Sequence, residues 1–150
     1  MGLFSNGGVS QVEYDSLKND LSIMRFEKDH VTFKAACAMM FADMQHRTGK
    51  CCGMIDAVSA LIDAGMPATA KTLYETIERD LVATLNSSNQ CHRNIVQAVD
   101  SLGNAKQAYL NILARDESPL YEQVNECNNL NIQIINMIKS FDQMFGVERD

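Results

Sequence analysis

The sequence predicts an all-α protein on three observations. The alternation of apolar and polar residues that is typical of strands is nearly absent, and helix-forming residues dominate the chain. Apolar residues recur every three or four positions, which is the helical period. Both prolines, Pro67 and Pro119, stand where helices should begin. We expect an elongated antiparallel helical bundle with three long helices and one short helix.

The first long helix is expected to follow a flexible lead-in over residues 1–9. Ser10 and Glu13 have the spacing of a capping box, which marks a helix start. Such a start is followed by an apolar seam with steps of three and four, interrupted at Lys28: Tyr14, Leu17, Leu21, Met24, Val31, Ala35, Ala38 and Ala42. A heptad seam of this kind requires a partner helix along its length. We expect the helix to end near Gly49.

A short second helix is expected over residues 51–64, with Gly65 as its C-terminal cap. Pro67 then opens a third helix, whose apolar rhythm falters at NSSNQ (residues 86–90) and resumes as far as Leu113. NSSNQ is either a break between two helices or a polar patch inside one. We favour one helix, because no glycine or proline enforces a stop.

The last helix is expected to begin at Ser118 and Pro119, as N-cap and first helical residue, and to end at Gly146. Short connections imply antiparallel neighbours. We therefore expect a single helical-bundle domain over residues 10–146, followed by a tail over residues 147–150.

Composition narrows the classes of function. The net charge of −6 and the absence of a Lys/Arg cluster argue against nucleic-acid binding. No apolar run reaches the roughly 18 residues of a membrane span. The first residues, MGLFSNGGVS, are too short and polar for a signal peptide. The odd count of five cysteines fits a reducing compartment, so we expect a cytoplasmic protein.

Two adjacent cysteines, Cys51 and Cys52, fall at the expected start of the short second helix. At a helix N-terminus, with Arg47 and Lys50 nearby, both thiols would be favoured as thiolates, which suits a metal ligand or a redox-sensitive thiol. The alternative is that they are small apolar residues packed at a corner between helices.

Three segments resemble the chemoreceptor zinc-binding (CZB) domain, a helical bundle of bacterial chemoreceptors and diguanylate cyclases. The segment DHVTFKAACAMMF, which contains His30, resembles its first helix. KCCGMI resembles its Cys-x-apolar-Gly element, and CHRNIVQAV resembles its His-x-x-x-His element, with Val96 at the second histidine. The resemblance implies a zinc site made by His30, Cys51 or Cys52, and His92, with Cys91 as a fourth ligand.

The expected topology places His30 far from the cysteine pair, so these residues would not share one site. If the chain turned back at the cysteine pair, those thiols would face the first helix near residue 46, roughly 20 Å from His30. Nothing in the sequence resembles a phosphate loop, a nucleophile elbow or a dinucleotide-binding motif, so we expect no enzyme and no cofactor.

The leading hypothesis is a non-enzymatic, cytoplasmic helical bundle that binds another protein or itself as a homo-oligomer, and neither nucleic acid nor membrane. The alternative is a zinc- or redox-responsive sensory bundle. Its candidate metal ligands are His30, Cys51, Cys52, Cys91 and His92.

Overall fold

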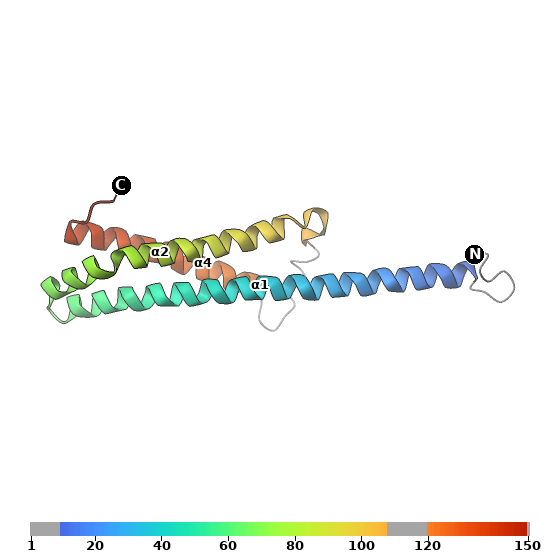
Figure 1. Cartoon of the computed structure of the whole chain (residues 1–150), viewed down its shortest axis with the longest axis horizontal. Helices are drawn as coiled ribbons and strands as arrows, with labels where there is room; N and C mark the ends of the chain where they lie inside the picture. The colour runs from blue at the N-terminus through green and yellow to red at the C-terminus, as the bar shows by residue number, and fades with distance from the viewer. Residues whose placement is uncertain (1–9, 108–119, 150) are drawn as a thin grey trace. The chain divides into compact units, whose positions relative to one another are not determined.

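The computed structural model describes the backbone of residues 10–107 and 120–149, and the side chains of these residues except 19–30. Its elements are the helices α1 (Gln11–Asp63), α2 (Pro67–Asp100) and α4 (Leu120–Phe145) and the short 3-10 helix η2 (Gly103–Ala105) (Figure 1). The described residues form no strand. The predicted all-α class, with three long helices and one shorter helix, is confirmed.

The capping box at the start of α1 is confirmed. The amide of Glu13 donates to Ser10 Oγ at 3.2 Å, and the amide of Ser10 donates to Glu13 Oε2 at 3.3 Å. These two bonds satisfy backbone donors that a helix start leaves without partners.

The predicted end of the first helix near Gly49 is wrong. Helix α1 continues to Asp63, so the expected short helix over residues 51–64 is the last part of α1. A glycine inside a helix costs about 1 kcal/mol relative to alanine, which one buried helical face readily offsets. Gly49 and Gly53 lie on the exposed side, with open space where a Cβ would stand. The helix therefore passes through both glycines.

The turn between α1 and α2 agrees with the prediction. Gly65 has a φ of 75°, a left-handed conformation that glycine adopts without strain. Pro67 is the first residue of α2. α2 runs through NSSNQ without a break, as we favoured.

The end of α2 differs from the prediction of a helix reaching Leu113. α2 stops at Asp100, and a turn and η2 follow, with Gly103 in a left-handed conformation at a φ of 57°. Leu113 itself lies outside the described residues. The predicted start of the last helix at Ser118 and Pro119 also lies outside them. Gly146, with a φ of 68°, ends α4 as predicted.

The chain divides into two compact units, which we call the N-terminal unit (Met1–Ala36) and the bundle unit (Cys37–Asp150). The expected single domain over residues 10–146 stays a prediction. In the bundle unit, α2 runs antiparallel to both α1 and α4. Contacts between Thr48 and Ser88 and between Cys51 and Leu81 pair α1 with α2, and a contact between Tyr74 and Asp142 pairs α2 with α4.

The buried face of α1 in the bundle unit follows steps of four and three: Cys37, Phe41, Met44, Thr48, Cys51, Ile55 and Val58. The predicted seam would continue instead through Ala38 and Ala42, which are exposed. The expectation that the seam reaches Ala42 is therefore wrong. Phe41 and Met44 remove more apolar surface from water than two alanines, so the face one residue earlier in the heptad is buried.

Candidate functional site

The candidate residues at the predicted corner lie inside a continuous helix. Cys51 is fully buried, and its thiol donates to the carbonyl oxygen of Leu81 at 3.8 Å. Burial, and then the neighbouring Cys52, raises the pKa of Cys51 to about 11. The prediction that a helix N-terminus favours its thiolate is wrong, because α1 begins forty residues earlier, at Gln11. Cys51 instead matches the alternative of a small packed apolar residue.

Cys52 is half-buried, and the cations expected beside it have other partners. Burial, followed by the charge of Asp56, raises the pKa of Cys52. Arg47 pairs with Asp43 at 3.1 Å, and Lys50 pairs with Asp80 at 3.3 Å. Cys52 borders an open cleft between α1 and α4 with a volume of about 330 Å³. It is therefore the thiol of the pair that solvent reaches.

The other candidate ligands, Cys91 and His92, are neighbours on α2. The Cys91 thiol donates to Asp43 Oδ2 at 3.4 Å, and burial and this bond raise the pKa of Cys91. The same bond, and then Arg47, lowers the pKa of Asp43. His92 is half-buried, and burial, followed by the charge of Arg93, lowers its pKa. At neutral pH these environments favour neutral side chains at both positions.

The structure does not bring the pair Cys51 and Cys52 together with the pair Cys91 and His92. Cys51 contacts α2 at Leu81, whereas Cys91 contacts α1 at Asp43, eight residues earlier than Cys51. At 1.5 Å per residue this is a separation of about 12 Å along α1. The side chain of His30 lies outside the described residues. Within the described part of the chain, no three His, Cys, Asp or Glu side chains are close enough to hold a metal ion.

A buried polar layer joins all three long helices. Thr48 of α1 donates to Asn131 Oδ1 of α4 at 2.7 Å, and Asn131 Nδ2 donates to Ser88 Oγ of α2 at 2.9 Å. Ser88 Oγ lies 2.8 Å from Thr48 Oγ1 and 3.3 Å from the carbonyl oxygen of Met44. Ser88 and Asn131 are fully buried. Because each polar atom finds a partner only in one register, the layer fixes how the helices align.

The heptad spacing of α4 predicts one member of this layer. The buried positions of α4 follow steps of four and three: Leu120, Val124, Cys127, Asn131, Ile134, Ile138, Phe141 and Phe145. The neighbouring apolar residue, Leu130, has a side chain that is 44% exposed. Keeping the heptad spacing strictly would have placed Asn131 in the core.

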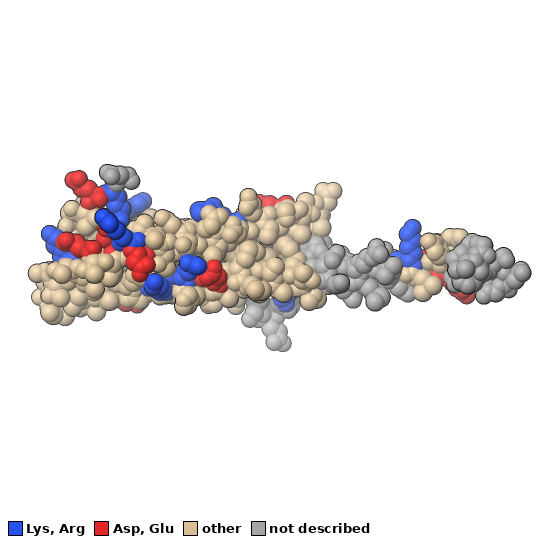
Figure 2. Space-filling model, viewed as in Figure 1, with Lys and Arg blue, Asp and Glu red and all other residues tan. Residues whose placement is uncertain are grey.

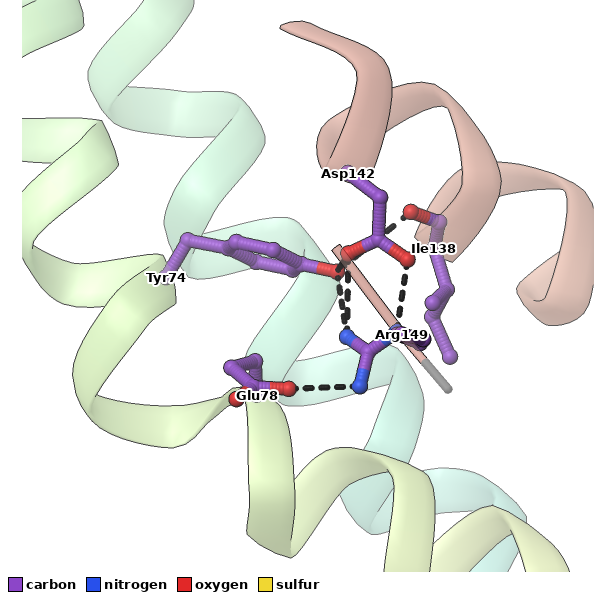
Figure 3. Close-up of polar contacts among 5 residues, drawn as sticks. All are labelled: Tyr74, Glu78, Ile138, Asp142 and Arg149. Atoms are coloured by element: carbon purple, nitrogen blue, oxygen red, sulfur yellow. Dashed lines mark hydrogen bonds and ion pairs between the residues drawn. The ribbon is translucent and has the colours of Figure 1, made fainter. Parts of the chain in front are cut away.

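A second polar network lies near the end of α4 (Figure 3). Tyr74 is fully buried, and its hydroxyl donates to Asp142 Oδ1 at 2.6 Å. Arg149 Nε donates to Asp142 Oδ2 at 2.6 Å, and Arg149 Nη2 donates to Tyr74 Oη at 3.1 Å. Arg149 Nη1 forms an ion pair with Glu78 Oε2 at 2.6 Å. The segment after Gly146, expected as a tail, is thus held against α2 and α4 by Arg149.

The pKa shifts within this network favour the ion pair between Asp142 and Arg149. Burial and the bond to Asp142 raise the pKa of Tyr74, so its hydroxyl stays protonated. Burial acts to raise the pKa of Asp142, but hydrogen bonds from Arg149 and Tyr74 prevail and lower it. The bond to Asp142 raises the pKa of Arg149. Tyr74 also packs edge-on against Phe141, with ring centroids 5.3 Å apart. The network thus joins α2 to the end of α4 and to Arg149.

The apolar residues of the N-terminal unit have a different environment. Val12, Leu17 and Val31 have side chains that are 78%, 59% and 65% exposed, and Tyr14 is 47% exposed. Of the side chains described in this unit, those of residues 10–18 and 31–36, none is buried. The predicted seam is therefore exposed at each of its described large apolar positions: Tyr14, Leu17 and Val31.

The viewed face of the bundle unit carries charges of both signs (Figure 2). Figure 2 shows Lys and Arg residues intermixed with Asp and Glu residues on the viewed face of this unit. Within this unit, Lys50 pairs with Asp80 and Lys71 pairs with Glu75. Within residues 10–107 and 120–149, no helix combines the length and apolar character that crossing a membrane requires.

Comparison with known proteins adds no relative: no protein-family model, no curated protein and no solved structure matches the chain. The likeness to the CZB domain therefore rests on the three short segments of sequence alone.

Proposed function

We propose that this protein is a non-enzymatic, cytoplasmic interaction module. In this proposal the bundle unit is a folded support, and the N-terminal part of α1 is the arm that binds an apolar helical partner. The observation that carries the proposal is the exposed seam, represented by Tyr14, Leu17 and Val31.

Single exposed apolar residues are normal on protein surfaces, but a row at heptad spacing is not. A helix without tertiary packing is only marginally stable in water, even when its sequence favours helix. The helical residues before Cys37 have a capping box, yet none of their described side chains is buried. A partner on the seam would supply the missing stabilisation, because burying apolar surface is the main favourable contribution to association.

The bundle unit supports the same interpretation. Its core packs residues of α1, α2 and α4 against one another, and its buried polar layer satisfies the side chains of Thr48, Ser88 and Asn131 internally. Its buried face on α1 is one residue out of phase with the N-terminal seam, so the seam is not a continuation of that core. The seam is left for a different helix.

The test is site-specific photo-crosslinking of the full chain in the cells that produce it. A photoreactive residue at Leu17 or Val31 is expected to crosslink to a protein partner. Matched positions outside the seam, Asp15 in the N-terminal unit and Met144 in the bundle unit, are both exposed and are expected to crosslink several-fold less. Equal crosslinking at all four positions, or none at Leu17 and Val31, would reject the arm as a binding surface.

The zinc-responsive alternative stays a prediction that rests on the resemblance to the CZB domain. None of the contacts described for Cys51, Cys52, Cys91 and His92 favours it. Zinc content, measured on protein purified without affinity-tag metal, tests it directly. One zinc per chain that is lost on His92→Ala would favour this alternative over the interaction module.

A further inference from the structure

The heptad register of the N-terminal seam carries information about the identity of its partner. With Tyr14 at position a, the seam from residue 14 to 31 places its members alternately at a and d: Tyr14, Leu17, Leu21, Met24, Lys28 and Val31. These residues lie within one uninterrupted helix. The fifth member of this series, Lys28, occupies position a, and a single polar residue at a is a known determinant of register and oligomeric state.

The charged residues beside the seam are sorted by sign. Position g holds the acidic residues Glu13, Asp20 and Glu27, and position e holds the basic residues Lys18 and Arg25. In a parallel coiled coil, a g residue faces the e residue of the next heptad on the other helix. Glu13 of one copy then faces Lys18 of the other, and Asp20 faces Arg25, so opposite charges meet at each pair.

An antiparallel arrangement of the same seam gives the opposite result. There, g residues face g residues and e residues face e residues. Acidic residues would then face acidic residues and basic residues would face basic ones, and like charges placed together oppose association. The sequence is thus complementary to itself in one orientation only.

From these observations we infer that the occupant of the seam is a second copy of this chain, paired in parallel through residues 14–31. This inference rests on the proposed function and specifies its partner. It also accounts for the exposure of Tyr14, Leu17 and Val31 in the single chain. The parallel pairing ends near Ala35. From Cys37 onward, the buried face of α1 lies one residue earlier in the heptad and belongs to the bundle unit.

The first experiment measures mass and orientation on the full chain. Sedimentation equilibrium over a range of concentrations is expected to show a monomer and dimer equilibrium. Leu17→Cys then places one thiol at position d of each copy, where a parallel dimer brings the two together. Under a glutathione redox buffer, this variant is expected to form a disulfide-linked dimer at least about tenfold faster than Asp15→Cys, the matched control at position b.

The native cysteines set the background of this assay, so the unsubstituted chain is run beside both variants. A dimer in which Leu17→Cys crosslinks no faster than Asp15→Cys overturns the parallel seam. A monomer at every concentration overturns the second copy as partner. Neither result removes the proposed function, which is rejected by the photo-crosslinking experiment if Leu17 and Val31 capture no protein or capture no more than the control positions.

Charge reversal gives an independent test of the parallel orientation. Glu13→Lys with Asp20→Lys turns the attractive pairs into repulsive ones and is expected to weaken the dimer by about tenfold or more. Adding Lys18→Glu and Arg25→Glu restores opposite charges at each pair and is expected to recover the wild-type dissociation constant to within about threefold. Because the restored variant keeps Glu13→Lys, recovery also excludes loss of the capping box as the cause. Failure to recover would overturn the inference.

Discussion

Helix α1 carries two apolar stripes of the same period, one in each unit, and they differ in burial. In the bundle unit, the stripe that includes Met44, Cys51 and Val58 is fully buried. In the N-terminal unit, Leu17 and Val31 of the other stripe are largely exposed. This difference shows that periodicity predicts a helix and its apolar face. The presence of neighbouring helices decides whether that face is part of a core.

The two units also differ in how their polar groups specify a neighbour. In the bundle unit, Thr48, Ser88 and Asn131 specify alignment through hydrogen bonds inside the core. In the N-terminal unit, charged residues such as Glu13 and Lys18 flank the apolar seam. Buried hydrogen bonds suit a permanent intramolecular core, because an unpaired buried group is costly. Flanking charges suit a partner that arrives from solution, because they act on encounter and orientation.

The largest expected effect contrasts one leucine from each unit. Leu81→Ala creates a cavity in the core, because Leu81 is fully buried, and should lower the free energy of unfolding by about 2–5 kcal/mol. Leu17→Ala alters a side chain that is 59% exposed and should change it by less than about 0.5 kcal/mol in dilute protein. Urea denaturation followed by circular dichroism measures both. Similar losses for the two variants would contradict the division into a packed and an unpacked part of α1.

The polar layer should show the next largest effect. Asn131→Ala removes an acceptor from Thr48 and a donor from Ser88, leaving buried polar groups without partners. We expect a loss of about 1–3 kcal/mol in unfolding free energy. Asn129→Ala, at an exposed position of the same helix, is the matched control and should be nearly neutral. A neutral Asn131→Ala would mean that the layer does not constrain the register.

The sequence predicted the fold class and four of the helix ends, because these depend on local chemistry. Ser10 with Glu13, Gly65, Pro67 and Gly146 act within a few residues of their own positions, and each does what its type predicts. The errors came where tertiary packing overrides a local signal. Gly49 resembled a helix end, but the buried face from Met44 to Val58 holds the helix together across it.

The candidate site was predicted less well for the same reason. The prediction of reactive thiols at Cys51 and Cys52 depended on a helix start that does not exist. Asn131 was overlooked because a buried asparagine is recognisable only from partners on other helices, Thr48 and Ser88, which are 83 and 43 residues away in sequence. Arg149 was overlooked because its partners, Tyr74 and Glu78, lie on α2.

The network around Arg149 should contribute a smaller, pH-dependent effect. The pKa of Asp142 is held below its ordinary value of 3.8, so the pairing stabilises the fold fully above about pH 4. This contribution is lost as the pH falls through the lowered pKa, because the protonated carboxyl no longer pairs with the guanidinium. Arg149→Met should therefore cost about 1–2 kcal/mol near pH 7 and less at lower pH.

Unfolding free energies of Arg149→Met and wild type, measured from pH 7 to pH 2.5, test this dependence. Lys139→Met is the matched control, since Lys139 is an exposed cation on α4. A difference between Arg149→Met and wild type that stays constant over the whole range would show that Arg149 acts by packing its aliphatic stem and not through Asp142.

The last prediction concerns the chemical reactivity of the cysteines in α1. It involves the smallest change in stability, but it is the sharpest test of this helix. With a pKa of about 11 in place of 9.0, Cys51 has about a hundredfold less thiolate near pH 8, and the thiolate is the species that alkylating reagents attack. Mass spectrometry should find the half-buried Cys52 modified well before Cys51 in the native protein, and all five cysteines modified in urea. Rapid modification of Cys51 would mean that α1 opens at Gly49 and exposes a helix start with a reactive thiol. The stripe buried in the bundle unit would then end before Cys51, and the contrast between the two halves of α1 would fail at this point.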